Sequence, residues 1–326
     1  MPFVNDILKY RSLSIVGLEK NTGKTVCLNY VLRRLAEERV PVAVTSIGVD
    51  GEQVDSVFAT AKPEITLYEG MKFITSEKHY LQRRLVSELL DVDAQRTSLG
   101  QLVTAQVLCQ GKVLLSGAAT TAKLREQIAR FEELVIVDGA LSRLSLASPT
   151  VTDAMVLATG AAVSPNLQQL ISKTRFVHRL INLEEAEGVN TEGINAGLWA
   201  IDSEGVAHDL GIASVFLLGK EERDLFRYGR TLFASGAVTD RLLKYLLSQK
   251  EPTTLIVRDF TKLFITPEVY AEYSKRGHSL QVLQRSRLVA ITLNPTSPTG
   301  YRLNSAQACQ QLSEALETPV YDVMTI

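Results

Sequence analysis

Short apolar runs alternate with amphipathic stretches along the first half of the chain. The apolar runs are near-continuous, and they cover residues 13–16, 42–46, 112–116 and 134–137. Runs of this kind are typical of strands that are covered on both faces in a parallel sheet. The spacing of apolar residues predicts helices over 24–38, 77–90, 99–110 and 123–131. This alternation predicts an α/β fold, with a mostly parallel sheet flanked by helices and joined by right-handed crossovers.

The predicted helix over 77–90 carries a leucine repeat. Leu81, Leu85 and Leu89 recur every four residues, whereas charged residues take the other directions. Because residues four apart lie on one face of a helix, we expect these leucines to form a stripe that packs into the core.

The rhythm is interrupted after residue 175, and no strong helical period is found up to about residue 215. Apolar segments at 198–201 and 206–210 flank Asp202-Ser203-Glu204-Gly205, which indicates a hairpin turn. Strand and helix patterns mix over 232–247, and then the α/β rhythm returns. The later segments are a strand at 254–257, a helix at 267–276, a strand at 288–293, a helix at 305–316 and a strand at 320–323.

The segment between the first predicted strand and the first predicted helix carries a candidate phosphate loop. It runs from Gly17 to Gly23 and leads into Lys24 and Thr25 at the start of the helix. Gly23 allows backbone N–H groups to close around phosphate oxygens, and the helix N-terminus adds positive potential. Lys24 would reach the β- and γ-phosphates, and the Thr25 hydroxyl would bind Mg²⁺.

This loop has five residues between its glycines, where the common P-loop has four. An ordinary strand-to-helix turn is the alternative interpretation. The nucleotide-site interpretation is favoured because the required strand precedes the loop and an amphipathic helix follows it. The predicted nucleotide-binding residues are Gly17, Glu19, Lys20, Asn21, Thr22, Gly23, Lys24, Thr25, Val26 and Asn294.

Two aspartates follow predicted strands, where an α/β sheet places its ligand-binding residues. Asp50 follows the strand at 42–46, and Asp138 follows the strand at 134–137. A phosphate loop needs carboxylates that hold Mg²⁺ and orient water. We therefore predict a metal site of Thr25, Asp50 and Asp138, and a catalytic set of Lys24, Asp50 and Asp138.

Both aspartates precede a glycine, so plain Asp-Gly turns are the alternative. Glu52 and Asp55 compete with Asp50 for its predicted role. With this site in place, the predicted organisation is a P-loop nucleotide-binding core over 1–175, a β-rich insertion over 176–250, and a C-terminal α/β segment over 251–326 that rejoins the core.

Asn294 bears on the choice of base. It follows the predicted strand at 288–293, in a position suited to contact a purine. GTP-specific P-loop proteins carry Asn-Lys-x-Asp at such a place, and the aspartate is missing here, which favours ATP. A turn former before Pro295 is the alternative role for Asn294.

Composition narrows the class of protein. The 326 residues include 35 Lys and Arg against 36 Asp and Glu, and the formal net charge is −1. This balance argues against a general nucleic-acid or anionic-membrane binder, because both depend on a positive field. Apolar stretches of about 6–9 residues are too short for a membrane span, and the first residues do not form a signal peptide. We therefore expect a cytoplasmic protein.

The 3 cysteines, Cys27, Cys109 and Cys309, are far apart and show no metal-ligand spacing with the histidines. We expect all three to be small buried apolar residues and none to be a catalytic thiol.

Four segments together carry a family resemblance, namely residues 17–25, 46–52, 138–143 and 157–161. They resemble KamB, the reactivase subunit of lysine 5,6-aminomutase. The loop also resembles the wider branch of P-loop NTPases that contains dethiobiotin synthetase and MinD. The KamB resemblance implies an ATPase that works with a MutS-like subunit and restores a cobalamin-dependent aminomutase by exchanging damaged cofactor for intact adenosylcobalamin.

The resemblance also suggests roles for residues beyond the phosphate loop. Asp138 and Gly139 would sense the γ-phosphate, and the stretch through Arg143 would move on hydrolysis. In MinD-like relatives a loop lysine reaches across a homodimer. Glu19 holds the corresponding position here, and Lys20, one residue away, would take this role if it is not simply a solvated lysine. The Asp-x-His-x-x-Gly motif that binds cobalamin is missing from the sequence.

Two other functions remain open. One is an ATP-dependent small-molecule ligase related to dethiobiotin synthetase, although the stretch 45–48 lacks the lysine that the ligases place there. The other is a nucleotide-binding regulatory protein with negligible hydrolysis.

Overall fold

The computed structural model describes residues 2–47, 64–139, 144–213 and 225–326. Its contacts divide the chain into two compact units. Unit 1 comprises Met1–Arg175 and Arg287–Ile326, and unit 2 comprises Phe176–Ser286. Each unit has its own sheet and its own buried residues.

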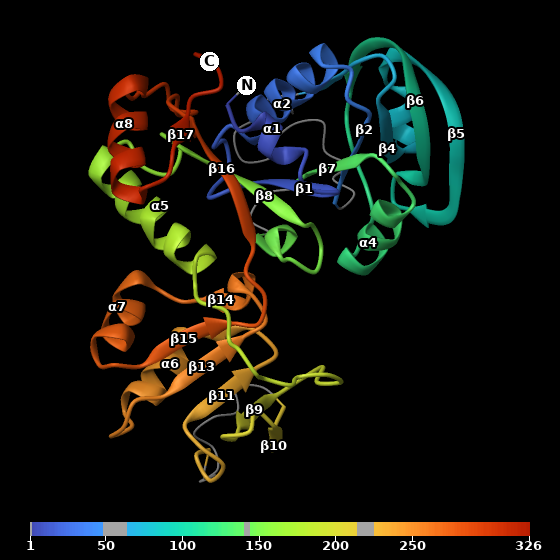
Figure 1. Cartoon of the computed structure of the whole chain (residues 1–326). Coiled ribbons are helices and arrows are strands. Elements are labelled where there is room, and N and C mark those ends of the chain that lie inside the picture. The colour runs from blue at the N-terminus through green and yellow to red at the C-terminus, as the bar shows by residue number, and fades with distance from the viewer. Residues whose placement is uncertain (1, 48–63, 140–143, 214–224) are drawn as a thin grey trace. The chain divides into compact units, whose positions relative to one another are not determined.

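Unit 1 is built on a mixed, mostly parallel sheet (Figure 1). Its described strands are β1 (Ser12–Gly17), β2 (Val42–Ser46), β3 (Ile65–Leu67), β4 (Lys72–Ser76), β5 (Arg84–Thr97), β6 (Gly100–Val113), β7 (Leu134–Asp138), β8 (Ala154–Gly160), β16 (Arg287–Asn294) and β17 (Val320–Tyr321). The strand order is β17-β16-β8-β1-β7-β2-β4-β6-β3, with β5 paired to β6. The strands from β17 to β4 are parallel, whereas β6 is antiparallel to β3, β4 and β5. The predicted α/β class is therefore confirmed.

The helices of unit 1 flank this sheet, as Figure 1 shows. They are α1 (Val4–Ile7), α2 (Lys24–Glu37), α3 (Glu77–Leu81), α4 (Thr121–Ala129), the part of α5 (Leu167–Ile181) up to Arg175, and α8 (Ser305–Leu316), with a short 3₁₀ helix at Leu144–Ala147. On α2, Leu28 and Leu32 are fully buried in one cluster with Ile15 of β1 and Ile136 of β7. Each buried leucine contributes about 1.5–3 kcal/mol. This packing holds the start of α2 at the carboxyl ends of β1 and β7.

The long hairpin of β5 and β6 corrects two predictions, because residues 77–90 and 99–110 were expected to be helices. The strands pair along most of their length, with register shifts, and α3 is a single short turn before them. On β6, Val103, Ala105 and Val107 are buried every second residue. Positions four apart share a face in a strand as well as in a helix, so the leucine spacing did not distinguish the two structures.

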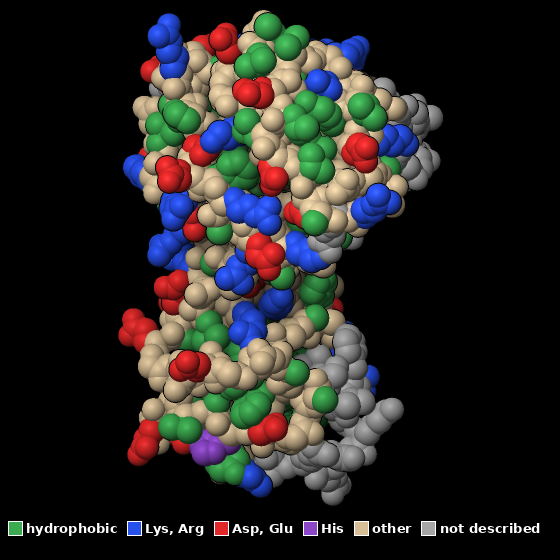
Figure 2. All heavy atoms as spheres, turned by 90° about the vertical axis from the view of Figure 1, so that its right-hand side faces the viewer, with side chains coloured by type: hydrophobic (Ala, Val, Ile, Leu, Met, Phe, Trp, Pro, Cys, Tyr) green, Lys and Arg blue, Asp and Glu red, His purple; other side chains and the backbone are tan. Residues whose placement is uncertain are grey.

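The expected leucine core stripe is also wrong. The side chain of Leu81 is 74% exposed and that of Leu89 is 51% exposed. Exposed apolar residues of β5 also include Val86, Leu90 and Val92. Figure 2 shows hydrophobic side chains gathered between charged ones on the face of the molecule that lies on the right-hand side of Figure 1, where the hairpin is drawn.

Unit 2 contains a second mixed sheet, in the order β10-β9-β11-β13-β15. These strands are β9 (Leu198–Ile201), β10 (Ala207–Ile212), β11 (Thr231–Ala234), β13 (Thr254–Val257) and β15 (Ser279–Val282). The helices α6 (Asp240–Leu247) and α7 (Pro267–Lys275), a 3₁₀ helix at Phe260–Lys262 and the short pair β12 (Val238–Thr239) and β14 (Leu263–Phe264) complete it. The predicted hairpin turn joins β9 to β10, which are antiparallel.

Three details of the second half differ from the predictions. The strand β13 was expected in the first sheet, but it pairs in parallel with β11 and β15. The chain therefore rejoins the first sheet at β16 and not at residue 251. A buried apolar strand has the same pattern in either sheet, so the sequence did not assign it. In addition, the helix α5 (Leu167–Ile181) extends past residue 175, where no helix was expected. The helices α6 and α7 of unit 2 agree with the helical patterns predicted within 232–247 and at 267–276.

The cysteines differ from one another. Cys27 is buried on α2, and burial raises the pKa of its thiol to about 12. Cys309 is half-buried, and Cys109 is exposed on β6, which corrects the expectation that all three are buried. None of the helices in the described part of the chain is long and apolar enough to cross a membrane.

Candidate functional site

The predicted site residues of unit 1 gather at the carboxyl ends of neighbouring parallel strands. Asp138, the last residue of β7, is in register with Ile15 of β1 and with Ser46 of β2. On the other side of β1, Gly17 is in register with Ala158 of β8. The order β8-β1-β7-β2 therefore brings the candidate phosphate loop and Asp138 to the same edge of the sheet.

The loop between β1 and α2 is held by its own hydrogen bonds. The Thr22 hydroxyl donates to the Glu19 carbonyl at 2.9 Å, and the Leu18 N–H donates to the carbonyl of Ala158 at 3.0 Å. Asn294, at the end of β16, donates from Nδ2 to the Asn21 carbonyl at 3.0 Å. These bonds fix the loop from inside and from the neighbouring strand β16.

Two glycines of the loop have no space for a side chain. A Cβ on Gly17 would lie 2.3 Å from the Thr22 hydroxyl oxygen and 3.0 Å from Lys24 Nζ. Gly23 has a φ of 90°, in the left-handed region, and a Cβ there would lie 2.8 Å from the Cβ of Asn294. Both positions therefore require glycine, as expected for a backbone that closes around a phosphate group.

Lys24 is the first residue of α2 and lies over the loop. Its ammonium Nζ donates to the Glu19 carbonyl at 3.4 Å. Burial lowers the pKa of Lys24 below its ordinary value, and the negative charge of Asp138 works in the opposite direction. The lysine and the aspartate thus face the same small region. A bound anion such as a phosphate would add negative charge there and stabilise the charged form of Lys24.

Thr25 and Asp138 fit the oxygen chemistry of a Mg²⁺ site. The structure gives the Thr25 hydroxyl no hydrogen bond within the described ranges, so it is available as a ligand. Those ranges contain no cluster of three or more His, Cys, Asp or Glu residues that could hold a metal alone. Mg²⁺ commonly takes one or two protein oxygens together with phosphate oxygens, which is the donor set that these two residues offer.

The other predicted residues are spread around the loop. Glu19 is exposed and forms an ion pair with Lys173 at 3.8 Å, Lys20 is half-buried, and the side chain of Val26 is exposed. Asp50, with its competitors Glu52 and Asp55, lies outside the described residues, as does Arg143.

Asn294 uses both ends of its amide within unit 1. Besides the bond to the loop, its Oδ1 accepts from the Thr296 N–H at 3.1 Å, as an asparagine does in a turn. A shallow pocket lies beside it, lined by Gly23, Val26, Pro295 and Met324 among others. This pocket adjoins the loop on the β16 side.

Ser46, which supports the backbone of Asp138, was not predicted as a site residue from the sequence. Ser46 of β2 donates its hydroxyl to the Asp138 carbonyl at 3.2 Å, and the Gly139 N–H donates to the Ile15 carbonyl at 3.1 Å. These bonds hold the backbone of Asp138 from both neighbouring strands. The signal was a buried serine at the end of an apolar strand, which needs a hydrogen-bond partner.

The comparisons with known proteins add no relative. No family model matches the chain, and neither a curated protein nor a solved structure matches it.

Proposed function

We propose that unit 1 binds a nucleoside triphosphate with Mg²⁺ at the loop between Gly17 and Thr25 and hydrolyses it. The observation that carries the proposal is the arrangement at the carboxyl edge of the sheet. A loop with two obligatory glycines leads into a helix that begins with Lys24 and Thr25, and Asp138 ends the adjacent strand. The favoured nucleotide is ATP.

Each residue has a role that follows from its chemistry. The backbone N–H groups of the loop and the N-terminus of α2 would bind phosphate oxygens, and Lys24 would neutralise their charge. The Thr25 hydroxyl and the Asp138 carboxylate would hold Mg²⁺, and the carboxylate would orient the attacking water. Bound Mg²⁺ supplies the charge that stabilises the transferring phosphoryl group.

ATP hydrolysis by the purified full chain tests the catalytic part of this proposal. Asp138→Asn keeps the size of the side chain and removes its charge, so turnover should fall at least about tenfold. Glu126→Gln makes the same change of charge on the exposed side of α4 and should leave turnover unchanged. Equal turnover in Asp138→Asn and the parent protein would remove Asp138 from the mechanism.

We further propose that the ATPase acts on protein partners, as a reactivase for a cobalamin-dependent aminomutase together with a MutS-like subunit. The support is the resemblance to KamB in the phosphate loop and in the segment after β7. Unit 2 adds a second sheet with its own buried cluster, which includes Phe233 and Ile256. A nucleotide-binding fold has no need of such a unit, so unit 2 is the candidate surface for the partner.

Partner-dependent turnover tests this step. The rate of ATP hydrolysis should rise when the MutS-like subunit and an aminomutase that carries damaged cobalamin are added. With intact adenosylcobalamin present, aminomutase activity should return. ATP consumption that is unaffected by these proteins but depends on a small carboxylic acid or amine would instead favour the ligase alternative.

A further inference from the structure

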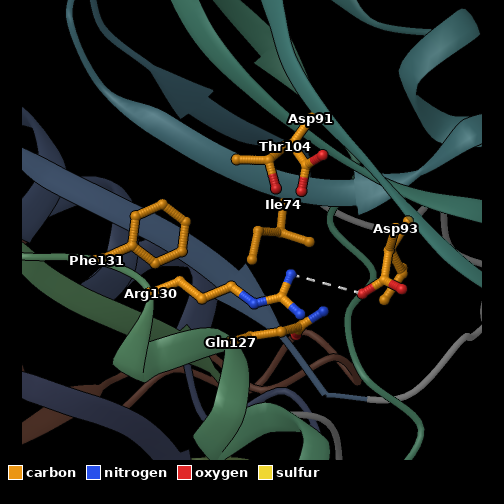
Figure 3. Close-up of a pocket in the computed structure, with 8 residues that line it drawn as sticks. Ile74, Asp91, Asp93, Thr104, Gln127, Arg130 and Phe131 are labelled. Atoms are coloured by element: carbon orange, nitrogen blue, oxygen red, sulfur yellow. Dashed lines mark ion pairs between the residues drawn. The ribbon is translucent and has the colours of Figure 1, made fainter.

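A cavity of about 160 Å³ lies in unit 1 between the hairpin β5–β6 and the end of α4, away from the phosphate loop (Figure 3). Its apolar side is formed by Ile74, Leu102 and Phe131, which are all buried. A cavity of roughly 150 Å³ is large enough to hold one benzene ring. The space therefore suits a molecule of about six to eight non-hydrogen atoms.

Gln127 of α4 is an unexplained polar group in this cavity wall. Its side chain is 4% exposed, and its buried Oε1 has no hydrogen-bond partner. The described residues give its Nε2 no partner either. A buried amide without partners costs about 1–3 kcal/mol, so such groups are rare unless a ligand or water completes them. Rotation of the amide presents either its donor or its acceptor to the cavity.

Three charged side chains, Asp91, Asp93 and Arg130, line the polar side of the cavity. Asp93 forms an ion pair with Arg130 at 3.8 Å, which Figure 3 marks, whereas Asp91 has no ion pair within the described ranges. Asp91 is in register with Thr104 on the neighbouring strand, and in Figure 3 both side chains point into the space beside Ile74. Among the described residues that line the cavity, two carboxylates therefore stand beside one guanidinium.

We propose that this cavity binds a small organic amine with an apolar body. Its ammonium group would lie against Asp91 and Thr104, and its body would fill the space beside Leu102 and Phe131, against the amide of Gln127. The ammonium would donate to the Asp91 carboxylate and to the Thr104 hydroxyl oxygen. The apolar wall favours an alkyl or aryl amine over a hydrated metal ion, which needs oxygen ligands on all sides.

Ligand-observed NMR titration with benzylamine tests the proposal directly. Benzylamine should bind with a Kd on the order of 1 mM, as expected for eight non-hydrogen atoms. Benzyl alcohol and benzoate, which share the ring and lack the cation, should bind at least about tenfold more weakly. Binding of benzyl alcohol as tight as that of benzylamine, or displacement of benzylamine by millimolar Mg²⁺, would overturn the proposal.

Variants locate the binding on the cavity. Asp91→Asn should weaken benzylamine binding about fivefold to tenfold, whereas Glu88→Gln, the same change on the same strand outside the cavity, should not change it. Gln127→Leu and Thr104→Val keep the volume and should each weaken binding about threefold. Unchanged affinity in Asp91→Asn, or in both of the last two variants when they fold as the parent does, would refute the site. Binding should persist in Lys24→Ala, so this result does not depend on the proposed nucleotide site.

Discussion

Gly23→Ala is the substitution whose consequence the structure defines most closely. Gly23 has a φ of 90°, and an added Cβ would lie 2.8 Å from the Cβ of Asn294. The methyl group would therefore enter a strained backbone conformation and also push against a neighbouring strand. Both effects act on the junction between β1 and α2.

The magnitude follows from two contributions. An L-residue in the left-handed region costs roughly 1–2 kcal/mol relative to glycine. The displaced Asn294 would lose its hydrogen bond to the Asn21 carbonyl, which contributes about 0.5–1.5 kcal/mol. The free energy of unfolding should therefore fall by about 1.5–3.5 kcal/mol.

Urea unfolding followed by far-ultraviolet circular dichroism measures this change. Gly70→Ala is the matched control, because Gly70 has a φ of 84° and a Cβ there would meet no atom within 4 Å. It should carry the cost of the backbone alone, so Gly23→Ala should be less stable than Gly70→Ala by about 0.5–1.5 kcal/mol. Equal stability of the two variants would refute the contact between Gly23 and Asn294.

Three further predictions concern charge, packing and reactivity. Burial lowers the pKa of Lys24, so its charged form disfavours folding, and Lys24→Met should raise the thermal midpoint at pH 7. This gain should shrink as the pH rises through the lowered pKa toward 10.5, because the lysine then loses its charge in the folded protein. A difference in thermal midpoint that stays constant with pH would contradict the prediction. On β6, Val107→Ala should lower the free energy of unfolding by about 1.5–3 kcal/mol because Val107 is buried. Leu108→Ala, at the exposed neighbouring position, should change it by less than about 0.5 kcal/mol. Equal losses of stability in the two variants would contradict the strand structure of β6. At pH 8 a disulfide reagent should label the exposed Cys109 rapidly, and the buried Cys27, whose thiol pKa is about 12, should not react; a fast phase that persists in Cys109→Ser would contradict this.

Much of the first sheet could be predicted from the sequence, because its strands are continuous apolar runs. The predicted ranges at 42–46 and 305–316 coincide with β2 and α8, and the predicted helix at 24–38 is α2. The phosphate loop could be located because its chemistry requires particular residue types at particular positions between the strand and the helix. The supporting bond from Ser46 could not be predicted, because it depends on which strands are neighbours.

The hairpin and the cavity were not predicted either, because the cavity depends on strand neighbours and the strands of the hairpin were not recognised. Residues 77–90 and 99–110 were assigned to helices and residues 91–98 to no element, so Asp91 and Asp93 were not recognised as members of one sheet region. The alternation of Val103, Ala105 and Val107 was the available signal, but bulges in the pairing of β5 obscure the same alternation in the first strand of the hairpin. The position of Gln127 opposite these strands is a tertiary property.

Titration calorimetry of ATP in the presence of Mg²⁺ tests the central claim most directly. The parent protein and Lys78→Ala, which removes an exposed lysine of α3, should bind the nucleotide with the same affinity. Lys24→Ala should bind at least about tenfold more weakly, because it removes a charge-assisted contact to phosphate. Equal affinity of Lys24→Ala and the parent protein would show that the loop between β1 and α2 is not the nucleotide site.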